Sequence, residues 1–208
     1  MEIISIPLEQ RSGANNQIPW EVTTSTGKDD EPLGPEIRTE FFDPRAFPLD
    51  PVWFERPQSI HGLSHTRRVL IHSSEVAASA GLDASEFESL VLAVAWHDIG
   101  RTHDGHDLEH GAKSVARIAE LGLAADIEPH VLTRVFFAIE LHSTYDETAI
   151  HRAASMADGE SMLRVLWVLK DADGLDRVRI SDLDPCYLRY PISRGLVARA
   201  WELLAQMP

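Results

Sequence analysis

The chain has 208 residues, a net charge of −14 and an apolar fraction of 44%, enough for one domain with a sizeable core, alone or with an extension. The acidity argues against a basic groove for nucleic acid, although a bound dication could still attract a phosphorylated substrate. A lone cysteine, a start unlike a signal peptide and the lack of any apolar run of about 20 residues lead us to expect a cytoplasmic protein without membrane contact.

Residues 1–55 differ in character from the rest of the chain. Prolines punctuate them, and acidic residues outnumber basic ones by eleven to four. We therefore predict an acidic, proline-rich N-terminal extension over residues 1–55, mobile or loosely wrapped on the body as far as about Ile37. Aromatic residues from Phe41 onward indicate that the later part packs against a domain formed by residues 56–208: Phe41, Phe42, Phe47, Trp53 and Phe54.

From Ile60 onward the apolar residues recur with a helical period. The pattern predicts helices over residues 64–80, 84–97, 107–121, 129–142, 147–154, 159–171 and 192–204. Gly81 and Gly122 stand where they would end helices in left-handed caps, and Asp83 with Glu86 forms a capping box. Asp107 is expected to cap the helix that follows it. Without strong period-two alternation, the domain is predicted to be an all-α helical bundle.

Residues 97–110 hold four of the ten histidines, together with three aspartates. The apolar stretch 90–96 delivers His97 and Asp98 from the end of a buried element. Imidazole and carboxylate offered together there form a plausible divalent-metal site, because imidazole suits Fe, Mn, Co, Ni and Zn. The alternative for this run alone is an acidic, histidine-rich surface loop.

Two further groups of ligand-type residues lie far from this run. His61 and His65 are four residues apart, so they could share a helix face and one metal. Residues 170–176 carry three aspartates directly after an apolar segment, and a buried carboxylate there needs a partner. A metal, Arg177 or Arg179 would each serve as that partner.

Taken together, these pieces resemble the HD-domain superfamily of metal-dependent phosphohydrolases over about residues 60–179. The resemblance rests on an order of motifs: His65 in His-Thr-Arg-Arg-Val, His97 and Asp98 in His-Asp-Ile-Gly, and Asp173 in Ala-Asp-Gly-Leu-Asp. It implies an all-α fold and a divalent transition metal (Mn, Fe, Co, Ni or Zn). His65, His97, Asp98 and Asp173 would hold that metal.

Subfamilies with two metals carry two further histidines between these motifs. This chain offers His110, before a Gly-Ala step, and His142, at the end of a predicted helix. His106 lies four residues before His110 and could take its place. With both histidines, Asp98 would bridge two metals in a six-ligand site. With one metal, His110 and His142 would act as acid and phosphate donor.

The loop after the His-Asp pair offers contacts to substrate phosphate. Arg101 and His103 are the candidates, because a guanidinium matches phosphate oxygens. Arg101 could equally pair with Asp104 or Asp107. We expect simpler roles for the remaining basic side chains. His61 should lie beside the ligands, and Arg68 and Lys113 should form salt bridges in preference to phosphate contacts. The other histidines should lie at the surface or in caps: His72, His130 and His151.

The resemblance implies a hydrolase that cleaves a phosphomonoester, phosphoanhydride or phosphodiester of a small phosphorylated substrate, which we expect to be a nucleotide. The metal would activate water and neutralise phosphoryl charge. The catalytic residues implied are Asp98, Arg101, His110 and His142. The same ligands fit a di-iron oxygenase of the superfamily, and a third hypothesis is a non-catalytic nucleotide-binding module, which has no evident need for all six groups.

Overall fold

The computed structural model describes residues 42–208. These form eight α-helices and three short 3-10 helices, with no strand among them. The predicted all-α class is therefore confirmed. The expectations for Phe41 and for the first 37 residues lie outside the described range. Within residues 42–208, no helix combines the length and the apolar composition needed to cross a membrane.

Most helices lie where the sequence predicts them. They are α1 (Leu63–Ala80), α2 (Ala84–Trp96), α3 (His110–Leu121), α4 (Pro129–Leu141), α5 (Asp146–Ala153), α6 (Gly159–Asp176), α7 (Pro191–Gly195) and α8 (Val197–Gln206). Gly81 and Gly122 adopt the left-handed conformation, each with φ 66°, and end α1 and α3. Asp83 and Glu86 form the capping box of α2 with both reciprocal hydrogen bonds.

Asp107 does not cap α3, contrary to the prediction. The helix begins at His110, with Glu109 at the N-cap and no side-chain cap. The carboxylate of Asp107 instead accepts the backbone N–H of Glu109 at 2.9 Å and the ammonium of Lys113 at 2.7 Å. An aspartate bonded to the backbone two residues on forms a local turn, and this turn delays the start of the helix.

Two C-terminal predictions are also wrong in detail. The segment predicted as one helix over residues 192–204 is two, α7 and α8, which meet at Leu196 with φ −89° and ψ 1°. Gly195 precedes the break and is a poor helix former. Helix α6 runs five residues beyond the predicted end, to Asp176. Asp171 and Asp173 thus lie inside the helix, and only Asp176 stands at its end.

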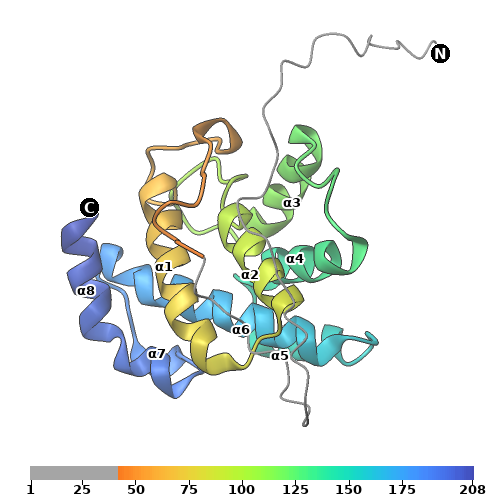
Figure 1. The fold of residues 1–208 in the computed structure, drawn as a ribbon. Helices are drawn as coiled ribbons and strands as arrows, with labels where there is room; N and C mark the ends of the chain where they lie inside the picture. Colours follow the sequence, from red (N-terminus) through yellow and green to blue (C-terminus); the bar gives the residue numbers. More distant parts are fainter. Residues whose placement is uncertain (1–41) are drawn as a thin grey trace, which may run out of the picture.

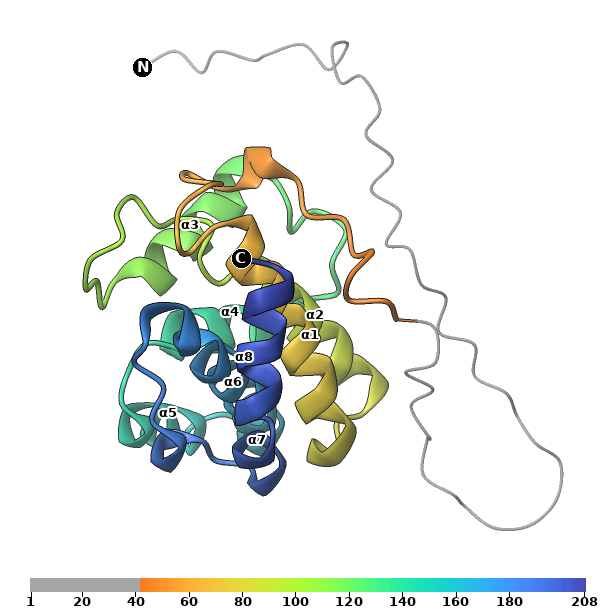
Figure 2. The ribbon, with the colours of Figure 1, turned by 90° about the vertical axis from the view of Figure 1, so that its left-hand side faces the viewer.

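The core lies between α1, α2, α4 and α6. Figure 1 shows α1 and α2 side by side, with α6 running across them, and α6 also packs against α4 and α5. Every residue from Ser89 to Gly100 is buried, so the whole second half of α2 is enclosed. Figure 2 shows α8 in front of α6 and α1, which it contacts. The end of α2 is thus held rigidly at the centre of the molecule.

Residues 42–60 lie on this bundle. Phe47 and Phe54 are buried in the core, and Phe42 and Trp53 pack against it. The backbone N–H of Glu55 donates to the carbonyl of Ile99 at 3.0 Å, which ties this segment to the loop after α2. The division of the chain after residue 55 stays a prediction.

Candidate metal centre

Four of the predicted ligands converge from three helices. His65 lies in α1, His97 and Asp98 directly follow α2, and Asp173 lies in α6. His65 Nε2 is 3.1 Å from His97 Nε2, 3.5 Å from Asp98 Oδ2 and 3.4 Å from Asp173 Oδ1. Bonds of about 2.0–2.2 Å place neighbouring ligand atoms of one ion roughly 2.8–3.6 Å apart. The ligand atoms of His65, His97 and Asp173 all lie within 4.8 Å of one another, a spacing that fits a divalent metal, and Asp98 Oδ2 lies close to both histidines.

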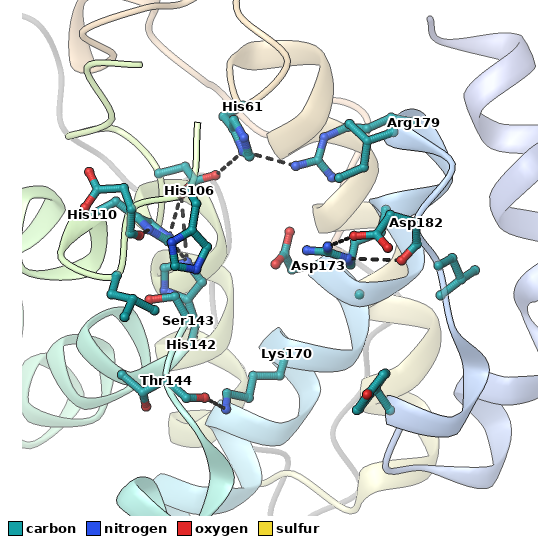
Figure 3. A pocket seen from close by; sticks show the side chains of 18 of the residues that line it. His61, His106, His110, His142, Ser143, Thr144, Lys170, Asp173, Arg179 and Asp182 are labelled. Atoms are coloured by element: carbon teal, nitrogen blue, oxygen red, sulfur yellow. Dashed lines mark hydrogen bonds and ion pairs between the residues drawn. The ribbon is translucent and has the colours of Figure 1, made fainter. Parts of the chain in front are cut away.

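The other two predicted ligands meet beside the same aspartate. His110 is the first residue of α3, and His142 directly follows α4. Their Nε2 atoms are 2.7 Å apart and lie 3.2 Å and 3.8 Å from Asp98 Oδ1. His106 is exposed, although it lines the neighbouring pocket (Figure 3). Of the two alternatives, His110 is therefore the histidine that the fold brings to Asp98.

The hydrogen bonds of these histidines leave their Nε2 atoms free to bind a cation. Their Nδ1 atoms face the carbonyl of Val94 for His97, the carbonyl of Asp107 for His110, the carbonyl of Ile139 for His142 and the carboxylate of Asp176 for His65. Because these oxygens can only accept, each Nδ1 carries a hydrogen. In the neutral imidazoles, Nε2 then carries a lone pair. The closely spaced Nε2 atoms thus repel unless a cation or proton lies between them.

For most of these histidines, protonation does not relieve this repulsion. Burial lowers the pKa of His97 to about 3 and that of His110 to about 4, so both imidazoles are neutral at neutral pH. Burial and Arg179 also lower the pKa of His65, but Asp176 and Asp98 outweigh them and raise it. The donor set thus fits a metal better than it fits protons alone.

The carboxylates are ionised despite their burial. Burial raises the pKa of Asp98 and Asp173, but the surrounding imidazoles, joined at Asp173 by Arg179, outweigh this effect and hold both pKa values well below their usual range. Asp98 is also contacted by His61 Nδ1 at 3.0 Å and by Arg101 Nε at 3.2 Å. His61 thus contacts the ligand Asp98, and with His65 and Asp98 it forms a group that could itself hold a metal, so its place beside the ligands stays a prediction.

Sequence reasoning missed the part that Asp176 has in this centre. Its Oδ2 lies 2.7 Å from His65 Nδ1, and the Arg68 guanidinium donates to its Oδ1 at 2.6 Å and to its Oδ2 at 3.0 Å. The available signal was its spacing from Asp173, because residues three apart lie on one helix face. The salt bridges predicted for Arg68 and Lys113 are confirmed, since Lys113 pairs with Asp107.

Several other sequence expectations are settled by the geometry. His72 is fully buried, so its predicted surface or capping position is wrong; it lies two turns after His65 on the inward face of α1. His130 and His151 are exposed. Arg101 pairs with Asp98, whereas the other two aspartates offered to it are taken elsewhere: Asp104 by Arg56 at 3.0 Å and Asp107 by Lys113.

A pocket of about 790 Å³ opens beside the metal centre (Figure 3). Asp98, His110, His142 and Asp173 contribute to one part of its lining, and His103 is not among the lining residues. Cationic side chains from three parts of the chain share the lining: Arg101, Lys170, Arg177, Arg179 and Arg189. The pocket therefore combines a potential metal site with groups that attract an anion.

Comparison with known proteins agrees with this geometry. A family model described as HD domain matches residues 62–178, more than half of the chain, and this range includes the six predicted ligands. No curated protein and no solved structure matches the chain. HD domains bind divalent metals, and most are metal-dependent hydrolases. Since this match covers more than half of the sequence and the described residues form the all-α bundle of such domains, the chain belongs to the HD domain family.

Proposed function

We propose that the protein is a metal-dependent phosphohydrolase acting on a small phosphorylated substrate, with a nucleotide as the first candidate. The observation that carries the proposal is the convergence of six ligand-type side chains beside a pocket that is also lined by arginine and lysine. Metal and cationic groups together favour a phosphate ester or anhydride, because both stabilise charge on phosphoryl oxygens.

The residues divide naturally into two sets around Asp98. His65 and His97 face Asp98 Oδ2, and Asp173 faces His65, whereas His110 and His142 face Asp98 Oδ1. One ion would be held by the first set, and a second by the other set with Asp98 as the bridge. When bound, such ions lower the pKa of water and neutralise charge on the phosphoryl group.

The chain's own side chains would orient the phosphate. Arg101 lines the pocket and is anchored through Asp98 and through the carbonyl of Gly105 at 3.1 Å. Arg179 lines it from the other side and is fixed by the carbonyl of Ile60 at 2.8 Å. Two anchored guanidinium groups can bind phosphate oxygens without first losing much side-chain freedom. With a single metal, the lowered pKa of His110 would disfavour the role of acid that the sequence suggests for this residue.

The size and aromatic lining of the pocket support a nucleotide. Ligand pockets for molecules of that size are about 300–1,000 Å³, and this one is about 790 Å³. Tyr145 and Tyr187 line it with 80% and 78% of their surface exposed. Their rings offer flat apolar faces against which a base could stack.

The test is metal analysis combined with a substrate screen. Purified protein would be assayed for bound metal, then offered nucleoside phosphates and phosphodiesters with that metal restored. We expect Asp98→Ala to lose metal and turnover together, whereas Asp126→Ala, at an exposed aspartate outside the pocket lining, should change neither. Full metal content and unchanged turnover in Asp98→Ala would refute the proposal. Substrate-dependent oxygen uptake without phosphate release would favour the oxygenase.

A further inference from the structure

We infer that the two halves of the metal centre load in order, because Asp176 strengthens the first half whereas Arg101 competes with the cation of the second. The first half is His65, His97, Asp98 and Asp173, and the second is His110, His142 and the shared Asp98. The inference rests on the metal centre of the proposed function and is independent of the reaction catalysed there.

The first half is rich in negative charge and firmly held. It includes two carboxylates, Asp98 and Asp173, and a third, Asp176, stands behind His65 at 2.7 Å. A carboxylate that accepts the Nδ1 hydrogen of a ligand histidine fixes the ring and makes Nε2 a stronger donor. Asp176 is fully buried, and the two-pronged bond from Arg68 prevents it from turning away.

The second half has less charge. His110 and His142 donate their Nδ1 hydrogens to neutral backbone carbonyls. Its one carboxylate oxygen, Asp98 Oδ1, lies 3.2 Å from Arg101 Nε. This guanidinium is only 11% exposed and is also bonded to the carbonyl of Gly105. A second cation must therefore approach an oxygen that already faces a positive charge.

Positive charge near the first half is differently placed. Arg68 and Arg179 both contact Asp176, and Arg179 also approaches His61 at 3.0 Å. Among the described residues, neither arginine forms an ion pair with Asp98 or Asp173. Arg179 acts on the Asp173 carboxyl through space and helps to lower its pKa, but within the described part of the chain no guanidinium forms an ion pair with Asp173 or with Asp98 Oδ2, whereas Arg101 pairs directly with Asp98 Oδ1. The ligating oxygens of the first half therefore still attract a cation more strongly than the oxygen of the second half.

The arrangement couples the second metal to an anionic substrate. A phosphate bound at the remaining N–H groups of Arg101 would offset the positive charge of the guanidinium and so reduce its repulsion of a second cation beside Asp98 Oδ1. Because coupling between two ligands is reciprocal, the second cation would in turn tighten phosphate binding. The centre would then be completed chiefly when substrate is present.

Titration of metal-free protein with Co²⁺, followed by calorimetry and by visible absorption, tests this order. We expect two steps in the wild type, the first tighter. Asp176→Asn should raise the first Kd by about 10–100-fold and leave the second unchanged. Arg101→Gln should lower the second Kd by roughly 5-fold or more and leave the first unchanged. Inorganic phosphate should tighten the second step in the wild type more than in Arg101→Gln.

The matched control is Asp171→Asn. Asp171 is equally buried in the same helix, but it pairs with Arg189 and lies outside the ligand set. Its loss should leave both Kd values unchanged, which separates positioning of His65 from a general effect on folding. Should Asp176→Asn not fold, Arg68→Lys keeps the charge but gives up the two-pronged bond, and it should raise the first Kd alone.

Equal affinity at the two steps, with no effect of Arg101→Gln, would overturn the inference. A protein that binds no metal would overturn both the inference and the metal centre. Two unequal steps in a protein that releases phosphate from no substrate would support the inference and refute only the proposed function.

Discussion

Replacement of Gly111 by alanine should damage the second half of the metal centre through packing alone. Gly111 is the point at which α3 meets α4. A Cβ there would lie 2.3 Å from the carbonyl oxygen of Ile139 and 3.1 Å from the Cα of Glu140. Both obstacles are backbone, so the helices must separate by about 1 Å to reach ordinary contact distances. His110 on α3 would then move away from His142, which follows α4.

The expected cost follows from two opposing effects. Overpacking costs about 1–3 kcal/mol, and alanine returns up to about 1 kcal/mol relative to glycine within a helix. We therefore expect a net loss of about 1–2 kcal/mol in the free energy of unfolding. For a domain of this size the melting temperature should fall by about 2–8 °C. The second step of a Co²⁺ titration should weaken at the same time.

Thermal unfolding by circular dichroism and the metal titration together check this prediction, with Gly195→Ala as the control. Gly195 lies in α7, and a Cβ added there meets nothing within 4 Å. That substitution should stabilise the protein by about 0.4–1 kcal/mol. The reasoning would be refuted if Gly111→Ala melted at the wild-type temperature and bound the second metal normally.

Two further predictions concern stability. Burial raises the pKa of Glu86, but hydrogen bonds from Arg164 and from the backbone of Asp83 outweigh it and lower the pKa. Because its pKa is lower in the folded state, the Glu86 carboxylate stabilises the fold at pH values above its unfolded pKa of about 4.3. This stabilisation is lost as the pH falls through the folded pKa. In urea titrations, Glu86→Gln should lower the free energy of unfolding by about 1–3 kcal/mol at about pH 7, and the difference from the wild type should shrink in acid. A difference that stayed constant with pH would contradict this reasoning. Removal of the metal by a chelator should lower the melting temperature of the metal-loaded protein. A free metal concentration of about 100 times Kd stabilises the fold by about 2.7 kcal/mol, which corresponds to about 5–11 °C. Equal calorimetric melting temperatures with and without chelator would contradict this prediction.

The features predicted well from sequence depend on local chemistry. Gly81 and Gly122 end helices because their backbone tolerates a positive φ, and Asp83 with Glu86 begins one because the capping box needs only four consecutive residues. The ligand order was also accessible, since each motif lies within a few residues of a helix end. In the structure, the motifs that follow one another in this order along the chain lie close together in space.

Features that depend on distant contacts could not be predicted. His72 is buried because α1 is covered by α2 and α6, and nothing in its neighbouring residues indicates this. The pocket wall formed by Arg179 and Arg189 depends on how the chain turns after α6. Asp107 was misassigned because two local uses of an aspartate, a helix cap and a turn, have similar sequence signals.

The need for Asp176 follows from where each ligand histidine lies in its helix. His97 and His142 directly follow helices, and His110 begins one, so each finds a carbonyl three residues before it that helix bonding does not require. His65 lies inside the first turn of α1, where the preceding carbonyls begin the helix's own ladder; the carbonyl of Gly62, for example, accepts from Thr66. It must therefore obtain its acceptor from another helix, and α6 supplies Asp176. Three ligands are thus oriented by local backbone and the fourth by tertiary packing, and that fourth acceptor carries a charge. Because the contact between Asp176 and His65 joins two distant helices, the sequence does not indicate it. The same contact places a carboxylate behind His65 and so makes the first half of the centre the stronger metal site.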